Sequence, residues 1–321
     1  MSWILVLGTG PSQAPLIHAA RRRGFSIIGI DRLPNPNLVD VEIPISTYEA
    51  DKIINELDDG KKYPKPSGVL CRSSGPPLKT AVSIANKYSL PSSGSTIAEC
   101  SISKLALFNW AKENKIPTIA TLRCTGLEKI PSQWEVVIVK PSSPVFGKKN
   151  VFLIDKHGDL ASAIKIASTE SLDGYALVQP FIDGIDVCMV TVARNGKLLW
   201  SSFFQETVSF KNGAAKGEGV GSLGNNLRNE ELQVMAMTAK LLIKKSNASG
   251  FVFFSFRCPR KQAPMLYEVN PGLCGDNIAE KLFPAMWPNF DFYDLDVASA
   301  TNDLLRFPSS PPLTATVSFR I

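Results

Sequence analysis

The stretch Phe251–Asn277, FVFFSFRCPRKQAPMLYEVNPGLCGDN, decides the fold that we expect for this chain. Two apolar runs, Phe251–Phe256 and Met265–Val269, flank a basic connection that contains proline. This pattern predicts an antiparallel pair of strands. Pro271-Gly272 then ends the second strand, because proline has no N–H to donate to the ladder and glycine opens a turn.

Two polar side chains stand together at the end of the second predicted strand. Side chains alternate along a strand, so Glu268 and Asn270 are expected on one face while Val269 points into the core. A carboxylate and an amide oxygen side by side suit a hard cation such as Mg²⁺, which takes oxygen ligands and completes its shell with phosphates. The alternative is a surface glutamate beside a turn asparagine, and the rest of the chain has to decide between the two.

The composition is that of an ordinary globular protein, and it disfavours several function classes. The chain has 321 residues, of which 44% are hydrophobic and 20% charged, and this length suits two or three subdomains. The net charge of +6 is spread over short basic groups, which disfavours nucleic acid as a partner. The six cysteines include no CxxC pair, which disfavours a zinc site or a disulfide framework and indicates a cytoplasmic protein. No apolar segment reaches the roughly 20 residues that span a bilayer, so no membrane partner is expected.

The first third of the chain has the pattern of a parallel βαβ unit. An apolar run at Trp3–Leu7 is followed by a glycine turn, a helix at Gln13–Arg23 and a second strand that ends at Asp31. A dinucleotide-binding fingerprint, with this acid on a ribose hydroxyl, is one interpretation, but glutamine stands where the third glycine should be. We therefore expect a structural turn in a Rossmann-like domain over residues 1–95, which ends at a loop rich in proline, serine and glycine.

The middle of the chain contains a candidate phosphate-binding segment. We expect one helix from Ala98 to Asn114, which carries Lys104, and short strands after it. The strand Glu135–Lys140 is apolar until it ends in a lysine, and the polar loop beyond it contains Gly147. A lysine at a strand tip beside such a loop can hold phosphates through its charge and through backbone N–H groups. A solvated lysine at an ordinary hairpin is the alternative.

A hinge is expected at QPFIDGID, residues 179–186. An apolar strand meets a connection with Pro180 and Gly184, and a new strand begins at Asp186. Unpaired backbone N–H and C=O groups at a hinge can hydrogen-bond the edge of an adenine, and an acid just beyond it can take ribose hydroxyls.

Together and in this order, these segments resemble the ATP-grasp superfamily. The helix-borne lysine, the KP at residues 140–141 before the glycine loop, QPFIDGID and YEVNPG carry the resemblance, which covers roughly residues 1–300. The N-terminal GTGPSQAPLIHAARRRGF resembles the pre-ATP-grasp domain of the carbamoyl phosphate synthetase and purine-biosynthesis branch. The resemblance implies an α/β and α+β chain, with a Rossmann-like pre-ATP-grasp domain followed by an ATP-grasp fold of two α+β subdomains.

The resemblance also implies cofactors and roles for individual residues. ATP and Mg²⁺ are the implied cofactors, with Mn²⁺ as an alternative metal. Gln179 stands where the family usually has a glutamate that accepts from the adenine amino group. The implied nucleotide contacts are Lys104, Lys140, Ser142, Gly147, Lys148, Gln179, Phe181, Ile182 and Asp186. The implied catalytic residues are Lys140, Glu268 and Asn270, the last two as metal ligands.

One position departs from the family pattern. The family normally has an acid on the strand before the ExN motif, whereas FFSFR places Ser255 there. A neutral hydroxyl binds a metal weakly, so Glu268 and Asn270 could hold one ion while a second ion becomes doubtful. Asp276 lies close enough in sequence to contribute a further carboxylate.

The implied activity is that of an ATP-dependent carboxylate–amine ligase. ATP phosphorylates a carboxylate, and an amine or another nucleophile then attacks the acyl phosphate, so charge neutralisation and positioning carry the reaction. The two histidines, His18 and His157, are expected on the surface and form no Ser–His or Cys–His pair with a nucleophile. A nucleotide-binding protein that has lost metal competence at Ser255 is the rival interpretation. The expected partners are small-molecule carboxylate and amine substrates, and a homodimer is compatible with this function.

The remaining expectations concern domain organisation. The ATP-grasp domain is expected over residues 96–303, with a lid-like subdomain at about 120–180, and residues 304–321 form a tail or an edge strand. The stretch 205–226, QETVSFKNGAAKGEGVGSLGNN, is rich in glycine and small polar residues. It is expected to be a long mobile loop beside the acceptor substrate.

Overall fold

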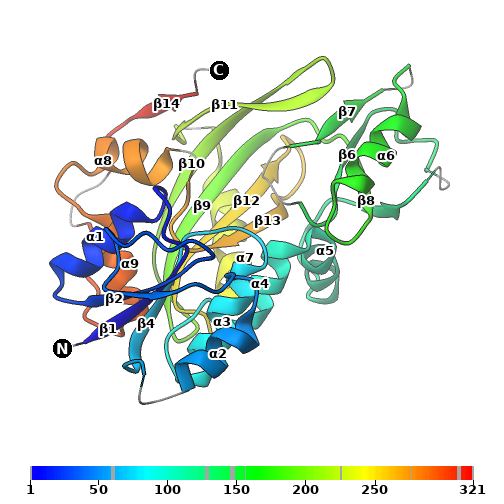
Figure 1. Ribbon diagram of the computed structural model, residues 1–321. Helices are drawn as coiled ribbons and strands as arrows, with labels where there is room; N and C mark the ends of the chain where they lie inside the picture. Colours follow the sequence, from blue (N-terminus) through cyan, green and yellow to red (C-terminus); the bar gives the residue numbers. More distant parts are fainter. Residues whose placement is uncertain are drawn as a thin grey trace.

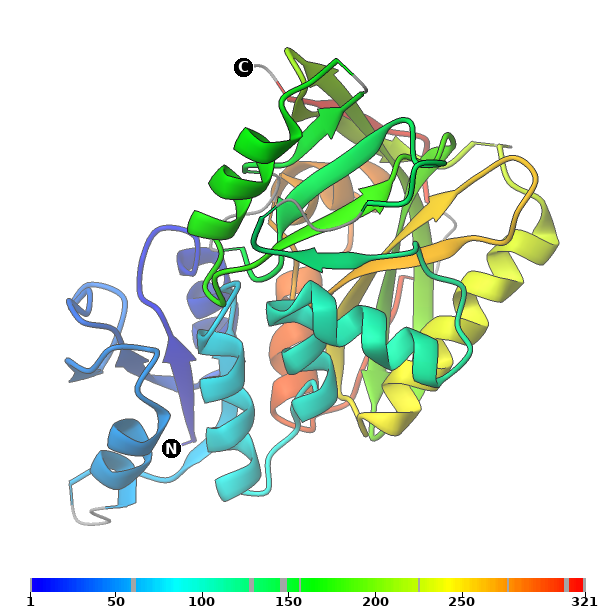
Figure 2. The same cartoon turned by 90° about the vertical axis from the view of Figure 1, so that its right-hand side faces the viewer.

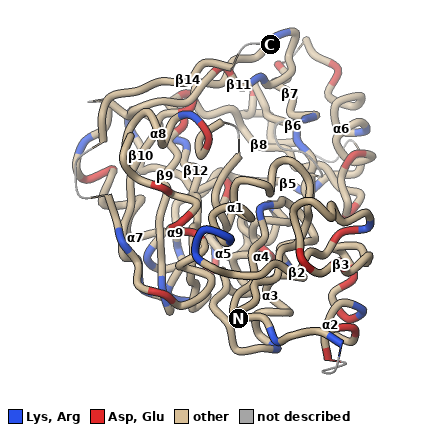
Figure 3. The backbone as a smooth tube through the Cα atoms, turned by 60° about the vertical axis from the view of Figure 1, so that its left-hand side comes forward, with Lys and Arg blue, Asp and Glu red and all other residues tan. Residues whose placement is uncertain are grey.

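The computed structural model describes residues 2–58, 62–126, 130–144, 149–155, 157–224, 226–275, 277–308 and 312–319. Two sheets organise these residues, one at the N-terminal end and a larger one that fills most of the molecule (Figure 1). Lysine and arginine are interspersed with aspartate and glutamate along the chain (Figure 3). Within the described residues, no helix combines the length and the apolar character that crossing a membrane requires.

The N-terminal sheet is built of short parallel strands with helices packed on both faces. Its strands are β1 (Trp3–Leu7), β2 (Ser26–Ile30), β3 (Val41–Ile43) and β4 (Pro66–Cys71), and its helices are α1 (Ala14–Arg22), α2 (Ala50–Asp58) and α3 (Pro77–Lys87). The strand order is β3-β2-β1-β4, and neighbouring strands run parallel. Continuous apolar runs such as Ile4–Leu7 are fully buried, as expected for parallel strands that are covered on both faces. The predicted Rossmann-like pattern is confirmed in this region.

The larger sheet is antiparallel and continuous with a smaller lobe. Its strands are β5 (Leu122–Cys124), β6 (Val137–Pro141), β7 (Phe152–Ile154), β8 (Ala176–Pro180), β9 (Ile185–Arg194), β10 (Lys197–Lys211), β11 (Ala214–Ser222), β12 (Gly250–Cys258), β13 (Met265–Pro271) and β14 (Thr316–Ser318). The order is β13-β12-β9-β10-β11-β7-β6-β8-β5, and β14 pairs with β11. Strands β5 to β8 and helix α6 (Leu160–Thr169) form the lobe at the upper right of Figure 1.

The large sheet has a separate hydrophobic core on each face. One core lies under α4 (Ser95–Ile102), α5 (Lys104–Glu113) and α7 (Asn229–Lys245), and it contains Leu107 and Leu242 of the helices together with Phe254 and Val269 of the sheet. Helix α7, yellow in Figure 2, runs alongside the strands on this side. The other core is aromatic and lies under the π-helical turn η1 (Ile278–Leu282), α8 (Phe283–Met286) and α9 (Phe292–Ala300). Its tightest ring pair is Phe283 and Phe292, whose centroids are 4.3 Å apart.

Helix α9 connects the two sheets. It packs on α1 and β4 of the N-terminal sheet and also on β12 of the large sheet. Arg23 at the end of α1 forms ion pairs with Asp294 at 2.8 Å and Asp303 at 3.2 Å. Arg194 of β9 donates to the carbonyl oxygens of Ala298 and Asp303. The last long helix therefore belongs in space to the junction between the two sheets.

Two expectations about local structure were wrong. The single helix expected over 98–114 is two helices, because Ser103 adopts an extended conformation and its hydroxyl caps α5 by accepting from the Ala106 N–H. The mobile loop expected over 205–226 is largely the hairpin of β10 and β11. Its glycines serve close packing, since a Cβ at Gly219 would lie 2.7 Å from the Val317 carbonyl oxygen of β14. The tail thus forms an edge strand, as one of the two expected alternatives.

Candidate active site

The residues singled out from the sequence come from two structural units that face each other. Lys140 and Gln179 lie near the ends of β6 and β8 in the lobe, and Asp186, Glu268 and Asn270 lie on strands of the large sheet. Their side chains are mostly buried or half-buried. The expected surface positions of His18 and His157 are confirmed, since both are exposed.

A β-bulge shapes the strand that carries Glu268. On β12 and β13, Ser255 pairs with Glu268 and Phe256 pairs with Leu266, so Tyr267 is an extra residue on β13. Both Leu266 and Val269 are fully buried in the same core, although they are three positions apart. The bulge therefore turns Tyr267 and Glu268 together toward the face opposite that core, a local device often found beside active sites.

The elbow between α4 and α5 reaches both predicted metal ligands. Lys104 is the first residue of α5, and its Nζ lies 2.5 Å from Oε1 of Glu268. Ser101 near the end of α4 donates to Oδ1 of Asn270 at 3.1 Å. The break at Ser103 creates this elbow, which allows two helices to hold neighbouring positions of one strand. The expectation that Glu268 and Asn270 share a face agrees with these contacts.

Lys140 is a buried lysine at the tip of β6. Its side chain is only 7% exposed, and its Nζ lies 5.7 Å from the centroid of the Tyr267 ring. Burial, and to a smaller extent the nearby charge of Lys104, outweigh the opposite effects of Glu268 and Asp186 and lower the pKa of Lys140 from 10.5 to about 7. A cationic group that is held where its charge is disfavoured is suited to an anionic ligand.

Ser142 ties the tip of β6 to the start of α5. Its carbonyl oxygen accepts from the Lys104 N–H at 2.9 Å, and its own N–H donates to the Tyr175 carbonyl at 3.0 Å. The Ser142 hydroxyl is fully buried and has no hydrogen-bond partner within the described residues. A buried hydroxyl of this kind calls for an explanation, and a bound ligand is one that fits its place beside the two lysines. The predicted loop residues Gly147 and Lys148 lie outside the described residues.

At the hinge, each of Phe181 and Ile182 uses one backbone group in a hydrogen bond within the protein. The Phe181 N–H donates to the Val136 carbonyl at 2.8 Å, and the Ile182 carbonyl accepts from Nε of Arg257 at 2.8 Å. Among the described residues, the Phe181 carbonyl and the Ile182 N–H have no backbone hydrogen-bond partner. Gln179 is 7% exposed and its amide nitrogen donates to the Thr121 hydroxyl at 2.7 Å, which leaves its amide oxygen as an acceptor.

Arg257 and Tyr267 are site residues that the sequence reasoning missed. Arg257 lies across from Asp186 in the β12–β9 register and donates to its carboxylate at 2.9 Å. The same guanidinium lies 5.6 Å from the Phe181 ring centroid, so it links the hinge to the predicted ribose contact. Burial raises the pKa of Tyr267 well above its ordinary value, and the charges of Asp186, Glu206 and Glu268 raise it further. The only signal for the bulged tyrosine was the three-residue spacing of Leu266 and Val269.

The metal donor set fits one Mg²⁺ ion. Glu268 and Asn270 offer a carboxylate and an amide oxygen on one face, and Mg²⁺ usually completes its shell with water and phosphates. Ser255 lies directly across from Glu268 and is 8% exposed, so a neutral hydroxyl occupies the place of the family's second acid. Within the described part of the chain, no three His, Cys, Asp or Glu side chains gather into a metal-binding group. Asp276 lies outside that part.

In the glycine turn of the N-terminal sheet, the protein's own side chains fill the turn and form hydrogen bonds there. The Gln13 side chain is buried against Gly8 and donates to the Arg72 carbonyl at 2.9 Å. The Asp31 carboxylate accepts from the Thr9 N–H at 3.0 Å. The groups that a dinucleotide would need are thus used by the turn itself, which favours the structural reading of this motif.

Comparisons with known proteins identify solved structures that are similar to this architecture. No protein-family model matches the sequence, and no curated protein matches it. The L-amino acid ligase from Bacillus licheniformis superposes with a TM-score of 0.73 at 17% identity, over 95% of this chain and 75% of that one. Biotin carboxylase from Campylobacter jejuni superposes with a TM-score of 0.71 at 14% identity, over 98% and 74%. Phosphoribosylglycinamide synthetase from Anaerococcus prevotii superposes with a TM-score of 0.67 at 15% identity, over 94% and 75%.

These similar structures are all ATP-grasp proteins, and the similarity extends over nearly the whole chain in each case. At 14–17% identity, the comparison concerns the fold. The parallel N-terminal sheet and the antiparallel sheet with its lobe agree with this similarity, and the chain has the fold of these ATP-grasp structures, with a Rossmann-like N-terminal domain.

Proposed function

We propose that the protein is an ATP-dependent ligase that activates a carboxylate as an acyl phosphate for attack by an amine or another nucleophile. The observation that carries the proposal is the meeting of two lysines, Lys104 and Lys140, with Glu268 and Asn270 between the lobe and the large sheet. Cations and metal-binding oxygens at one place suit the phosphates of a nucleotide.

The hinge supports adenine as the base. Adenine presents an amino donor beside a ring-nitrogen acceptor, and the Phe181 carbonyl and Ile182 N–H offer the complementary pair. The Gln179 amide oxygen supplies a second acceptor. Solved structures with the same fold include an ADP complex of N5-carboxyaminoimidazole ribonucleotide synthetase and a carboxylase domain crystallised with MgADP and bicarbonate.

The chain's own residues account for the charge changes of the reaction. A carboxylate oxygen attacks the γ-phosphorus, the bond to ADP breaks, and the excess charge on the phosphoryl oxygens is offset by Lys104 and Lys140. The phosphates favour the protonated form of Lys140, whose pKa is about 7 in the free protein. The nucleophile then attacks the acyl carbon, phosphate leaves, and an amine gives up a proton. Bound Mg²⁺ would be held by Glu268 and Asn270 and would neutralise phosphate charge.

Lys104 is expected to change partners when nucleotide binds. In the free protein it is paired with Glu268, and its side chain is 13% exposed. Binding of Mg²⁺ to Glu268 would release the lysine toward the phosphates, because a carboxylate that ligates a cation attracts Lys104 less. Binding of Mg²⁺ and binding of the nucleotide phosphates would therefore promote each other within one site.

The proposal is tested by ADP release in the presence of ATP, Mg²⁺ and a panel of amino acids and small carboxylic acids. We expect at least one acid to stimulate ADP release, and we expect ATP with Mg²⁺ to raise the melting temperature more than NADP does. A larger shift with NADP would contradict the nucleotide assignment. An ATP-dependent shift without ADP release under any acid, which Ser255→Asp then converts into turnover, would favour the rival nucleotide-binding function.

A further inference from the structure

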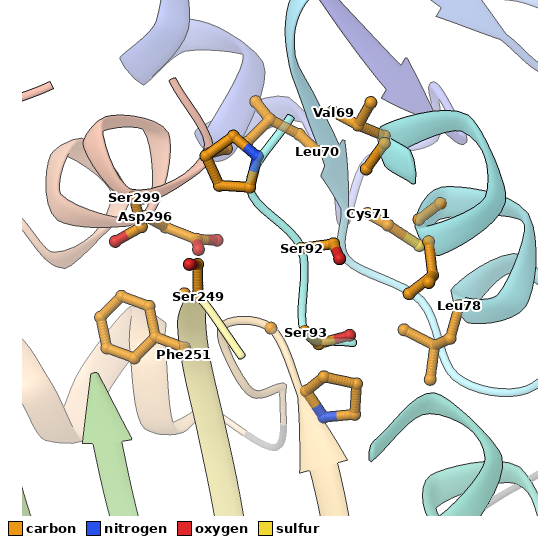
Figure 4. A pocket seen from close by; sticks show the side chains of 18 residues that line it. Val69, Leu70, Cys71, Leu78, Ser92, Ser93, Ser249, Phe251, Asp296 and Ser299 are labelled. Atoms are coloured by element: carbon orange, nitrogen blue, oxygen red, sulfur yellow. The ribbon is translucent and has the colours of Figure 1, made fainter. Parts of the chain in front are cut away.

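A cavity of about 70 Å³ lies at the junction of the two sheets, and its lining begins on β13 at Pro271, the residue after the candidate metal ligand Asn270. Its walls come from the end of β4, from α3 and α9, from the loop at Ser92 and Ser93, and from the ends of β12 and β13 at Phe251 and Pro271 (Figure 4). A volume of this size holds a few water molecules or a small ion.

A buried carboxylate faces this cavity. Asp296 of α9 is 9% exposed, and Figure 4 shows its side chain and that of Ser249 turned toward each other. Within the described residues, no lysine, arginine or histidine forms an ion pair with Asp296; the backbone N–H of Leu273 hydrogen-bonds to it. Arg72 is the cation that acts on it from a distance, and its guanidinium bonds to Glu280 and to the carbonyls of Ser12, Leu273 and Cys274. Burial raises the pKa of Asp296 to about 7, and a cationic ligand beside the carboxylate would favour its charged form.

Of the four serines that line the cavity, Ser249 and Ser299 present acceptors through hydroxyl groups that donate elsewhere, and the Ser92 hydroxyl accepts from the Gly94 N–H. Ser249 donates to Oδ1 of Asn195 and accepts from the Asn195 N–H, so its hydrogen is directed away from Asp296. Ser299 donates to the Leu295 carbonyl at 2.8 Å. Because Ser249 and Ser299 donate to other groups, their oxygens and the Asp296 carboxylate are acceptors that face the cavity. An ammonium group offers three donors and no acceptor, which complements this set.

We propose that the cavity binds a small ammonium cation, either ammonium itself or a short primary alkylammonium ion. The apolar walls at Val69, Leu78 and Phe251 suit a methyl group beside the charge and distinguish the site from that of a fully hydrated metal ion. The inference does not rest on the proposed ligase reaction, because none of the residues assigned to nucleotide or Mg²⁺ lines the cavity.

The test uses the full chain and measures thermal unfolding at about pH 8, where carboxylates are ordinarily ionised. Ammonium chloride and methylammonium chloride are compared with sodium, potassium and tetramethylammonium chloride at equal ionic strength. We expect a saturable rise in melting temperature with ammonium or methylammonium beyond that with the other salts. Greater response to methylammonium identifies an alkylamine as the ligand class, and greater response to ammonium identifies the bare ion. Equal responses to potassium and to both amines would overturn the proposal.

Substitutions test whether the response to ammonium ions arises in this cavity. Asp296→Asn should weaken methylammonium binding at least about tenfold by calorimetry, since a charge-assisted hydrogen bond is lost. Asp294→Asn removes the same charge from the same helix outside the cavity, so its baseline stability can fall while its ammonium-dependent increment stays. If Asp296→Asn fails to fold, Ser249→Ala and direct calorimetry on the unmodified chain decide. Undiminished binding in both cavity variants, or no binding to the unmodified chain, would refute the site.

Discussion

Replacing Lys140 by methionine should stabilise the free protein while abolishing its response to ATP. The side chain is buried, and its pKa lies at about 7 in place of 10.5. Each pKa unit corresponds to about 1.4 kcal/mol, so the folded state bears a penalty of up to about 5 kcal/mol when the lysine is charged. Methionine has a similar length and no charge, and it should remove most of this penalty.

The sign of the pH dependence follows from the lowered pKa. Between about pH 7 and pH 10.5 the unfolded chain keeps its Lys140 proton and the folded chain does not. The unfolded state therefore binds more protons, and the stability of the unmodified protein should rise with pH through this window. Below about pH 7 both states are protonated, so the full penalty is present. The advantage of Lys140→Met should thus be largest near pH 7 and shrink toward pH 10.

Urea unfolding followed by tryptophan fluorescence at several pH values measures these differences. Lys165→Met provides a matched control, because Lys165 is an exposed lysine on α6 of the same lobe. The control should be close to the unmodified protein at every pH and should keep the stabilisation by ATP and Mg²⁺. If Lys140→Met showed no pH-dependent advantage, burial would not disfavour this charge. If it were still stabilised by ATP as strongly as the unmodified protein, Lys140 would not contact the phosphates.

Three further substitutions test the same site. Glu268→Gln should lower turnover at least about tenfold in assays of ADP release against Mg²⁺ concentration, because a neutral amide is a weak ligand; unchanged turnover would place the metal elsewhere. Ser255→Asp should lower the Mg²⁺ concentration needed for half-maximal activity, since it adds a carboxylate across from Glu268, and an unaltered Mg²⁺ curve would contradict the proposed donor set. Arg257→Ala should raise the KM for ATP about tenfold with a smaller change in kcat, because Asp186 and Ile182 lose the group that orients them. A variant with the original KM would show that Arg257 has no positioning role.

Local sequence signals predicted the strand that carries the candidate metal ligands. The apolar run and the proline that follows are properties of neighbouring residues, and the observed strand Met265–Pro271 agrees with the expected strand Met265–Val269. Val269 is buried as the alternation required. The N-terminal βαβ pattern was predicted for the same reason, since its strands and helices are each marked by their own composition.

Features that depend on distant segments could not be predicted in the same way. Residues 214–222 form a strand because β10 and β14 pair with its two edges, although their composition is typical of a loop. Arg257 belongs to the site because it reaches Asp186 and Ile182, which are 71 and 75 positions away. The break at Ser103 depends on an extended backbone conformation that helix propensity alone does not specify.

The bulge at Tyr267 makes the effect of a deletion in β13 depend on which residue is lost. Deleting Tyr267 would restore regular pairing with β12, and Leu266 would stay in the core with Glu268 on the opposite face, because adjacent strand residues alternate. Deleting Val269 would instead make Glu268 and Asn270 neighbours and turn them to opposite faces. In a lineage of such proteins, a loss of one residue from this strand should therefore be kept at the bulge far more often than between the two candidate metal ligands.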